Sequence, residues 1–418
     1  MNATKAILAY VLMLFSTTIT GQQHEIYKPE IKSLQVVCGD KWLALPIMKL
    51  SSNTPEENTI NISFDDLTHT YHRYTYSIIH CESDWSPSSE LFPSDYIEGF
   101  ATDNTIEDID ESVNTNVLYT HYRIKIPNER CRLKISGNYE LTVYDDDSGE
   151  KVLTARFMVL DPQMSVNLYA STNTDIDTNG SHQQISMRLN YNSTKVTDPK
   201  SEIKTIVMQN RRWDNAKTNI PAQYITTTGL EWTHNKELIF DAGNEYHKFE
   251  TLSTSHSTMG IDNISWDGEN YHAAVFHDVP RPNYLYDEDA NGAFYIRNSD
   301  NIESETTCDY MFVDFTLECP KQIQGEVYLN GAWTYDSLLP EYEMVYNSEK
   351  KQYTGSVMLK QGYYSYQYIV RKPNGETGIM PTEGSYFQTE NKYQALIYYK
   401  KQGDRYDKLI GYQEIQIK

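Results

Sequence analysis

The chain has 418 residues, with 58 acidic and 36 basic side chains and a net charge of −22 at pH 7. A field of that sign repels phosphate backbones and anionic lipids, so the composition argues against nucleic-acid and membrane-surface binding. The length exceeds what one hydrophobic core fills, and it predicts about three domains.

The N-terminus predicts a secretory signal peptide over residues 1–21. Lys5 precedes an apolar run at residues 6–15, and a small, polar stretch follows the run before Gln22. The run is about half of the roughly 20 residues that a membrane span requires. No cysteine closely follows it. We therefore expect an exported protein with neither a lipid anchor at that point nor direct membrane insertion.

Alternating aromatic and aliphatic residues predict β-strands in the first module, residues 31–162. The expected strands are 33–38, 74–79, 120–126, 138–144 and 154–160. The acidic turn at 145–149 predicts a hairpin between the last two. A long polar insertion at 83–116 is either an ordered Ω-type loop or a binding loop, and its tryptophan and phenylalanines favour order.

Two further modules follow, at residues 163–300 and 305–418. The expected strands of the middle module are 183–191, 205–210 and 237–242. Those of the last are 309–317, 325–333, 353–360, 363–370 and 393–400. No segment shows a sustained helical period. The fold class is therefore all-β, with about three tandem immunoglobulin-like or early-set β-sandwich modules after the signal peptide.

The cysteines and acidic turns do not predict a cofactor or metal site. Five cysteines are an odd number, and no Cys/His cluster suggests zinc. Cys308 and Cys319 flank an expected strand whose ends lie about 36 Å apart, too far for a disulfide between them. The segments 175–180 and 287–292 begin like calcium loops but lack the glutamate at position twelve, so we interpret them as turns.

The run QNRRWDNA supplies candidate partner contacts in Gln209, Asn210, Arg211, Arg212 and Trp213. Arginine and tryptophan are the residues that most often anchor protein interfaces. A structural stack of an arginine on the indole explains the run equally well.

Trp333 is a further candidate contact. With the GYYSYQY segment that follows, it resembles early-set sandwiches that bind starch-like glucans, although a buried tryptophan is the commoner use in such folds. The GxSxG, HExxH and P-loop motifs do not occur, and we interpret the protein as non-enzymatic.

Nine segments, in order from about residue 31 to residue 413, resemble the plug protein family of the type IX secretion system. They are YTYSIIHCESDW, YTHYRIKIPN, SGNYELTVYD, QNRRWDNA, AGNEYHKFE, DANGAFYI, LKQGYYSYQY, TENKYQALIYYK and GDRYDKLIGYQ. The resemblance implies a periplasmic protein of Bacteroidota at the inner face of the outer membrane. There it would cap the periplasmic opening of the translocon barrel, as a monomer within a larger complex, with no catalytic residues and no cofactor.

Two other classes compete with this interpretation. A periplasmic or surface carbohydrate-binding protein would expose coplanar aromatic rings such as Trp333. An outer-membrane barrel would also show alternating strands, but here the strands are uneven in length and their faces too polar to form a lipid-facing band.

Overall fold

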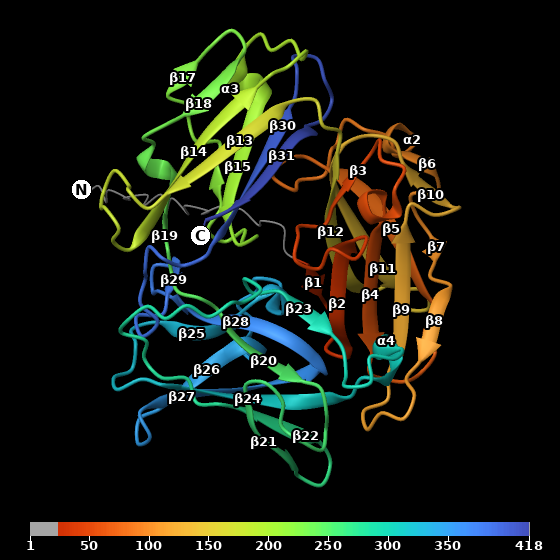
Figure 1. The fold of residues 1–418 in the computed structure, drawn as a ribbon. Helices are drawn as coiled ribbons and strands as arrows, with labels where there is room; N and C mark the ends of the chain where they lie inside the picture. Colours follow the sequence, from red (N-terminus) through yellow and green to blue (C-terminus); the bar gives the residue numbers. More distant parts are fainter. Residues whose placement is uncertain (1–23, 418) are drawn as a thin grey trace, which may run out of the picture.

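The computed structural model describes residues 24–417, so the predicted signal peptide lies outside the described residues. The prediction of an all-β chain is confirmed: strands dominate, and every helix is three or four residues long in this range. None of these helices is long or apolar enough to cross a membrane. Figure 1 shows three β-sandwiches grouped around a common centre.

The first sandwich packs two sheets over one core. One sheet contains β1 (Glu25–Ile26), β12 (Lys151–Leu160), β11 (Gly137–Asp145), β5 (Tyr74–Cys81), β7 (Asn104–Thr105) and β3 (Ile47–Lys49). The other contains β2 (Ile31–Cys38), β4 (Ile60–Asp66), β9 (Thr120–Ile126) and β8 (Asp108–Glu111). Side chains of both sheets pack against one another in this core, for example Phe64 of β4 against Tyr74 of β5, with ring centroids 5.9 Å apart.

The polar insertion is ordered and belongs to this sandwich. It carries β7 and β8 together with α2 (Pro93–Tyr96) and β6 (Ile97–Gly99), and β6 pairs with β10 (Cys131–Leu133). A further short helix, α1 (Pro55–Asn58), precedes β4. The insertion also contributes Trp85, whose side chain is buried. Trp85 therefore signalled order correctly, whereas Phe92 and Phe100 are 71% and 68% exposed and do not pack in the core.

The second sandwich is built from two distant parts of the chain. Its first sheet contains β13 (Ser165–Ser171), β14 (His182–Asn190), β18 (Gly229–Trp232), β17 (Tyr224–Ile225) and β19 (Ile239–Asp241). Its second contains β16 (Lys217–Thr218), β15 (Ile203–Gln209), β30 (Lys392–Tyr399) and β31 (Lys408–Gln416). The short helices α3 (Pro199–Glu202) and η1 (Lys236–Leu238) lie in its connections.

The third sandwich is one continuous sheet that folds over on itself. Along the sheet run β20 (His247–Thr251), β28 (Gly362–Arg371), β25 (Glu326–Asn330), β26 (Glu343–Asn347), β27 (Gln352–Lys360), β24 (Tyr310–Glu318), β22 (Tyr271–Val275) and β21 (Ile261–Trp266). Two short strands, β23 (Phe294–Ile296) and β29 (Thr377–Ile379), pair with β28. The remaining helices are α4 (Ser304–Thr307), η2 (Ala332–Thr334) and η3 (Pro340–Tyr342).

The sheets cross the module boundaries expected at 163–300 and 305–418. Strands β20 to β23 precede residue 300 but belong to the third sandwich, whereas β30 and β31 follow residue 305 and complete the second. The reason is pairing at long range: β30 pairs with β15, with Gln209 opposite Tyr393. Strand patterns reveal which residues are buried, but they do not reveal the pairing partner.

The first and second sandwiches also share a core of their own. Met158 and Leu160 of β12 meet Met208 of β15 and Leu396 and Tyr398 of β30 across an apolar layer. Strands β12 and β30 are therefore covered on both faces, and almost every residue in them is buried. The sheets of these two sandwiches thus form a four-layer stack (Figure 1).

Candidate functional site

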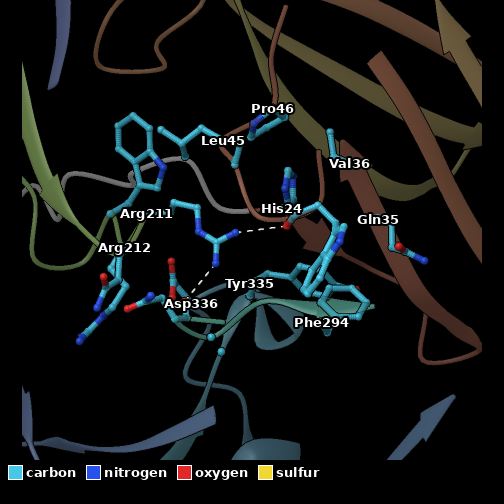
Figure 2. Close-up of a pocket in the computed structure, with 18 of the residues that line it drawn as sticks. His24, Gln35, Val36, Leu45, Pro46, Arg211, Arg212, Phe294, Tyr335 and Asp336 are labelled. Carbon is cyan, nitrogen blue, oxygen red and sulfur yellow. Dashed lines mark hydrogen bonds between the residues drawn. The ribbon is translucent and has the colours of Figure 1, made fainter. Parts of the chain in front are cut away.

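The run that holds the predicted contact residues lies where the three sandwiches meet (Figure 2). Arg211 follows β15 of the second sandwich. Its guanidinium donates to the carbonyl of Trp42 in the first sandwich at 3.3 Å, and to those of Ala290 and Asn291 in the third at 3.2 and 3.0 Å. One side chain therefore joins all three bodies.

A cavity of about 120 Å³ adjoins this arginine and is lined by residues of all three sandwiches, among them His24, Val36, Tyr246 and Tyr335. Burial, together with the nearby charge of Arg156, lowers the pKa of the His24 imidazole to about 3, so the ring is neutral at pH 7. Burial also lowers the pKa of Arg211. The cavity is thus a small gap where the three sandwiches meet.

Gln209 and Asn210 are buried and hold the end of β15 in place. The Gln209 amide donates to the carbonyl of Asp241 at 2.9 Å, and the Asn210 amide donates to the Asn391 side-chain oxygen at 2.7 Å. Asn210 also accepts from the backbone N–H of Lys392 at 2.8 Å. These contacts fasten β30 to the middle of the chain.

Arg212 pairs with Asp214 through two hydrogen bonds, of 3.0 and 2.5 Å. Burial opposes the charge on Asp214, but the Arg212 guanidinium holds the pKa of this carboxyl below its usual value. Burial, together with the charge of Asp214, raises the pKa of the neighbouring Asp336 to about 6. Arg212 is therefore part of a buried ion cluster with Asp214 and Asp336 at the junction.

Trp213 packs against Trp85 of the first sandwich, edge to face, with ring centroids 5.8 Å apart. An arginine–indole contact nearby is made by residues outside the run: the Arg156 guanidinium lies 5.8 Å from the centre of the Trp85 ring. The indole of Trp213 thus contributes to the apolar layer between the first two sandwiches.

Trp333 lies in the core of the third sandwich and is 4% exposed. Its indole N–H donates to the carbonyl of Ser365 at 3.1 Å, and its ring stacks on Phe315 and meets the edge of Tyr342. The ring has no free face for a sugar. In this structure Trp333 is a packing residue, and it does not lie beside the run at 209–213.

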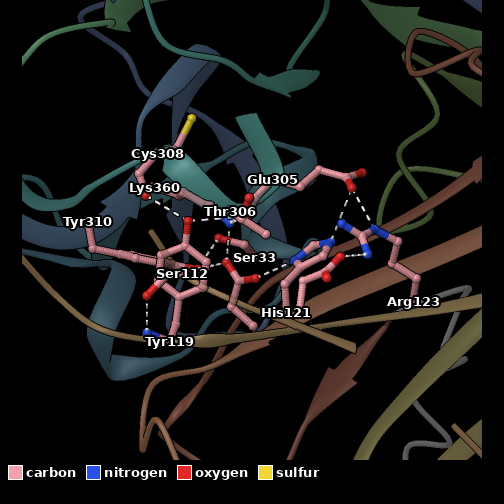
Figure 3. Close-up of polar contacts among 12 residues, drawn as sticks. Ser33, Ser112, Tyr119, His121, Arg123, Glu305, Thr306, Cys308, Tyr310 and Lys360 are labelled. Atoms are coloured by element: carbon pink, nitrogen blue, oxygen red, sulfur yellow. Dashed lines mark hydrogen bonds and ion pairs between the residues drawn. The ribbon is translucent and has the colours of Figure 1, made fainter. Parts of the chain in front are cut away.

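A second junction, between the first and third sandwiches, is a buried charge cluster that the sequence analysis missed (Figure 3). Asp65 of β4 accepts from Lys360 of β27 and from Tyr310 of β24, both at 2.6 Å, and from His121 of β9 at 2.5 Å. Burial opposes the charge of Asp65, but Lys360 and His121 hold its pKa below the usual value. Lys360 also lies over the Tyr119 ring at 4.1 Å.

The acidic turns are used within the fold. Asp175 pairs with His234 at 2.9 Å, and Asp177 pairs with His182 at 2.7 Å. In the second turn, Asp287 pairs with Lys248 at 2.5 Å. Over residues 24–417, no group of three or more His, Cys, Asp or Glu side chains is arranged to hold a metal ion. All five cysteines are buried, and each is free.

The comparisons with known proteins agree with the resemblance carried by the nine segments. The family model described as Type 9 secretion system plug protein 1st domain matches residues 31–161, which span the first sandwich from β2 to β12. A hypothetical protein from Parabacteroides merdae, known as a crystal structure, is 38% identical with a TM-score of 0.91. That similarity covers 95% of this chain and 100% of the other.

Two streptococcal structures are far more distant. The C-terminal domain of the antigen I/II-family protein AspA from Streptococcus pyogenes is 7% identical with a TM-score of 0.18, covering 93% of this chain and 99% of that one. The C-terminal domain of the AgI/II polypeptide BspA from Streptococcus agalactiae is 6% identical with a TM-score of 0.14, covering 86% and 91%. These scores support no argument about fold or function.

No curated protein matches the chain. The relative from Parabacteroides merdae shares the fold over nearly the whole chain. Through its first domain, residues 31–161, the chain belongs to the type 9 secretion system plug protein family, which indicates involvement in type IX secretion.

Proposed function

We propose that this protein caps the periplasmic opening of the outer-membrane translocon barrel of the type IX secretion system, as a monomer within the larger complex. The observation that carries the proposal is the joining of three sandwiches into one body by buried contacts. The side chain of Arg211 reaches all three, and Lys360 pairs with Asp65 across a second junction. A cap must hold its shape over a wide opening, and buried interfaces of this kind oppose domain motion.

Such a cap acts by occupancy and performs no chemistry. Its site of action is the periplasm at the inner face of the outer membrane, where a net charge of −22 favours a polar, reversible seat. In this proposal the run from Gln209 to Trp213 supports the cap indirectly, because it sets the angles between the sandwiches. Trp333 supports the cap by packing in the core of the third sandwich.

Deletion of the gene tests the proposal. An uncapped pore should make cells permeable to solutes that are normally too large for the outer membrane, while cargo secretion continues. The measurement is uptake of a large fluorescent solute or antibiotic by the parent, the deletion strain and the strain complemented with the full chain. A deletion strain as impermeable as its parent, together with no translocon barrel copurifying with the tagged protein, would refute the capping function.

A further inference from the structure

The connection between β22 and β23, residues 276–293, is a long segment without helix or strand. Irregular connections longer than about 12–15 residues are uncommon in compact domains, and when they are ordered they usually serve a function. Pro280 and Pro282 restrict its backbone. The way in which its side chains are distributed indicates what the function is.

Near the start of the segment, His277 is exposed, whereas the side chain of Asp278 points into the third sandwich. Asp278 accepts hydrogen bonds from the hydroxyls of Tyr366 and Tyr368, both at 2.7 Å, and pairs with His247 at 2.8 Å. The backbone N–H of Asp278 donates to the carbonyl of Thr316 at 2.9 Å. A charged residue is thus the anchor by which this stretch is fixed to the sheet.

The next polar residues are anchored in the same way. Arg281 forms an ion pair with the buried Glu383 and donates to the carbonyl of Glu245 at 2.8 Å. The Tyr284 hydroxyl donates to the Glu245 carboxylate at 2.6 Å. Burial raises the pKa of Asp289 to about 7, and its oxygens accept from two backbone N–H groups.

The apolar side chains of the same segment point outward. Phe276 is 57% exposed, Val279 51%, Leu285 80% and Tyr286 54%. Apolar groups gain free energy from burial, so these four side chains leave apolar area uncovered, while the charged Asp278 and Arg281 are held by contacts within the fold. A segment fixed by such contacts so that it presents apolar side chains is already organised for binding, so little conformational entropy is lost when a partner covers it.

The surroundings of the exposed pair Leu285 and Tyr286 are acidic. Asp287 and Glu288 follow directly in the chain and both are exposed, and of these two carboxylates Asp287 pairs with Lys248. Burial raises the pKa of Tyr286, and the charges that raise it further come from Glu390 and Glu288 among other carboxylates. A partner of complementary chemistry therefore offers an apolar pocket with arginine or lysine at its rim.

We propose that Leu285 and Tyr286 are the anchor by which this protein seats on the translocon, inserting into an apolar pocket rimmed by basic side chains. The proposal rests on the proposed capping function and identifies the face that performs it. Central apolar and aromatic anchors of this kind carry most of the affinity in protein interfaces, whereas the charged rim contributes specificity and salt dependence.

The test compares two matched double variants of the full chain. Leu285→Asp with Tyr286→Ala removes the anchor, and Tyr224→Ala with Ile225→Asp makes the same changes on β17 of the second sandwich. Tyr224 and Ile225 are 57% and 50% exposed. The measurement is the amount of translocon barrel retained by each tagged protein from solubilised membranes. We expect a loss of about tenfold or more for the anchor variant and wild-type retention for the control.

Thermal unfolding of both variants should match the wild type, because all four side chains are exposed. Equal retention by the anchor variant and the wild type overturns the anchor while leaving the capping function intact. A wild-type protein that retains no translocon overturns the capping function, and the anchor with it. If the two variants lose retention equally, the effect does not belong to this segment and the anchor is again overturned.

A charge reversal tests the basic rim separately. Glu288→Lys should weaken retention and make it less sensitive to salt, whereas Glu129→Lys, at an exposed turn of the first sandwich, should change neither. Retention that Glu288→Lys leaves unchanged would show that the rim of the pocket is not basic.

Discussion

At the scale of single residues, His247 is the clearest case of a side chain whose charge stabilises the fold. Its two ring nitrogens face Asp278 at 2.8 Å and Glu383 at 2.9 Å, and the residue is largely buried. Burial alone would lower the pKa of His247, but the two carboxylates raise it to about 9. The imidazolium is therefore present at neutral pH and holds together the carboxylates of two separate loops.

This arrangement predicts how stability depends on pH. Because the folded-state pKa is raised, the contribution of His247 is complete below pH about 6.5 and is lost as the pH rises through about 9. Urea unfolding at pH 7 and pH 10 should show that the wild type loses on the order of 3 kcal/mol more than His247→Gln does. Identical pH dependence in the two proteins would contradict this assignment.

At the scale of elements, the ion pair between Asp65 of β4 and Lys360 of β27 joins two sandwiches. Both side chains are at most 1% exposed. A buried ion pair adds little net stability over a well-packed apolar pair, but removal of one partner leaves an unpaired buried charge. The stability of this junction therefore depends more on both partners being present than on the pair being charged.

Lys360→Met should destabilise the protein by about 3–5 kcal/mol, because it leaves Asp65 buried with only His121 and Tyr310 as partners. The double variant Asp65→Asn with Lys360→Met should recover most of that loss. Denaturant unfolding of the wild type, the single variant and the double variant measures the difference. A double variant as unstable as the single one would show that the charge of Asp65 is not the cause.

The sequence predicted most of the elements that alternate cleanly. The expected strand 120–126 coincides with β9, and 353–360 differs from β27 by one residue. It did not predict the partners of these strands, since Asp65 and Lys360 meet across a sequence separation of 295 residues. A single sequence can show that a charged residue stands inside an apolar strand and needs a partner. It does not show which residue is that partner, because tertiary packing decides it.

The same limit applies to the candidate site. Arginine and tryptophan at 211–213 were predicted to contact a partner protein, and the pattern did not show that they make contacts with the chain's own sandwiches. Near-continuous apolar runs such as KVLTARFMVL in β12 and KYQALIYY in β30 are typical of strands covered on both faces. That signal could have indicated the shared apolar layer.

At the scale of the whole molecule, the three sandwiches differ in how the chain builds them. The first uses residues 25–160 and the third residues 247–379, each in one stretch, whereas the second needs β30 and β31 from the end of the chain. Five of the 17 buried residues in the core of the second sandwich come from β30 and β31, among them Tyr393, Ala395 and Ile397. The middle of the chain therefore does not contain a complete core.

A fragment of residues 163–300 should accordingly show no cooperative unfolding transition, because it lacks two strands of its second sheet. The matched contrast is the fragment 24–161, which holds every strand of the first sandwich and should unfold cooperatively. Circular dichroism during heating measures both. A cooperative transition in the fragment 163–300 would mean that the C-terminal strands are dispensable.

The position of β30 and β31 near the end of the chain also determines the order in which the sandwiches can fold. Synthesis proceeds from the N-terminus, so the first sandwich can close early and the third can close while residues beyond 379 are still being made. Meanwhile the strands from β13 to β19 have one apolar face uncovered. It is covered only when residues 392–416 have emerged and β30 can pair with β15, about two hundred positions earlier in the chain. Such distant pairing is slow to form. During this interval the apolar face of the second sandwich is exposed, and a premature stop in the last few dozen codons would leave that core incomplete.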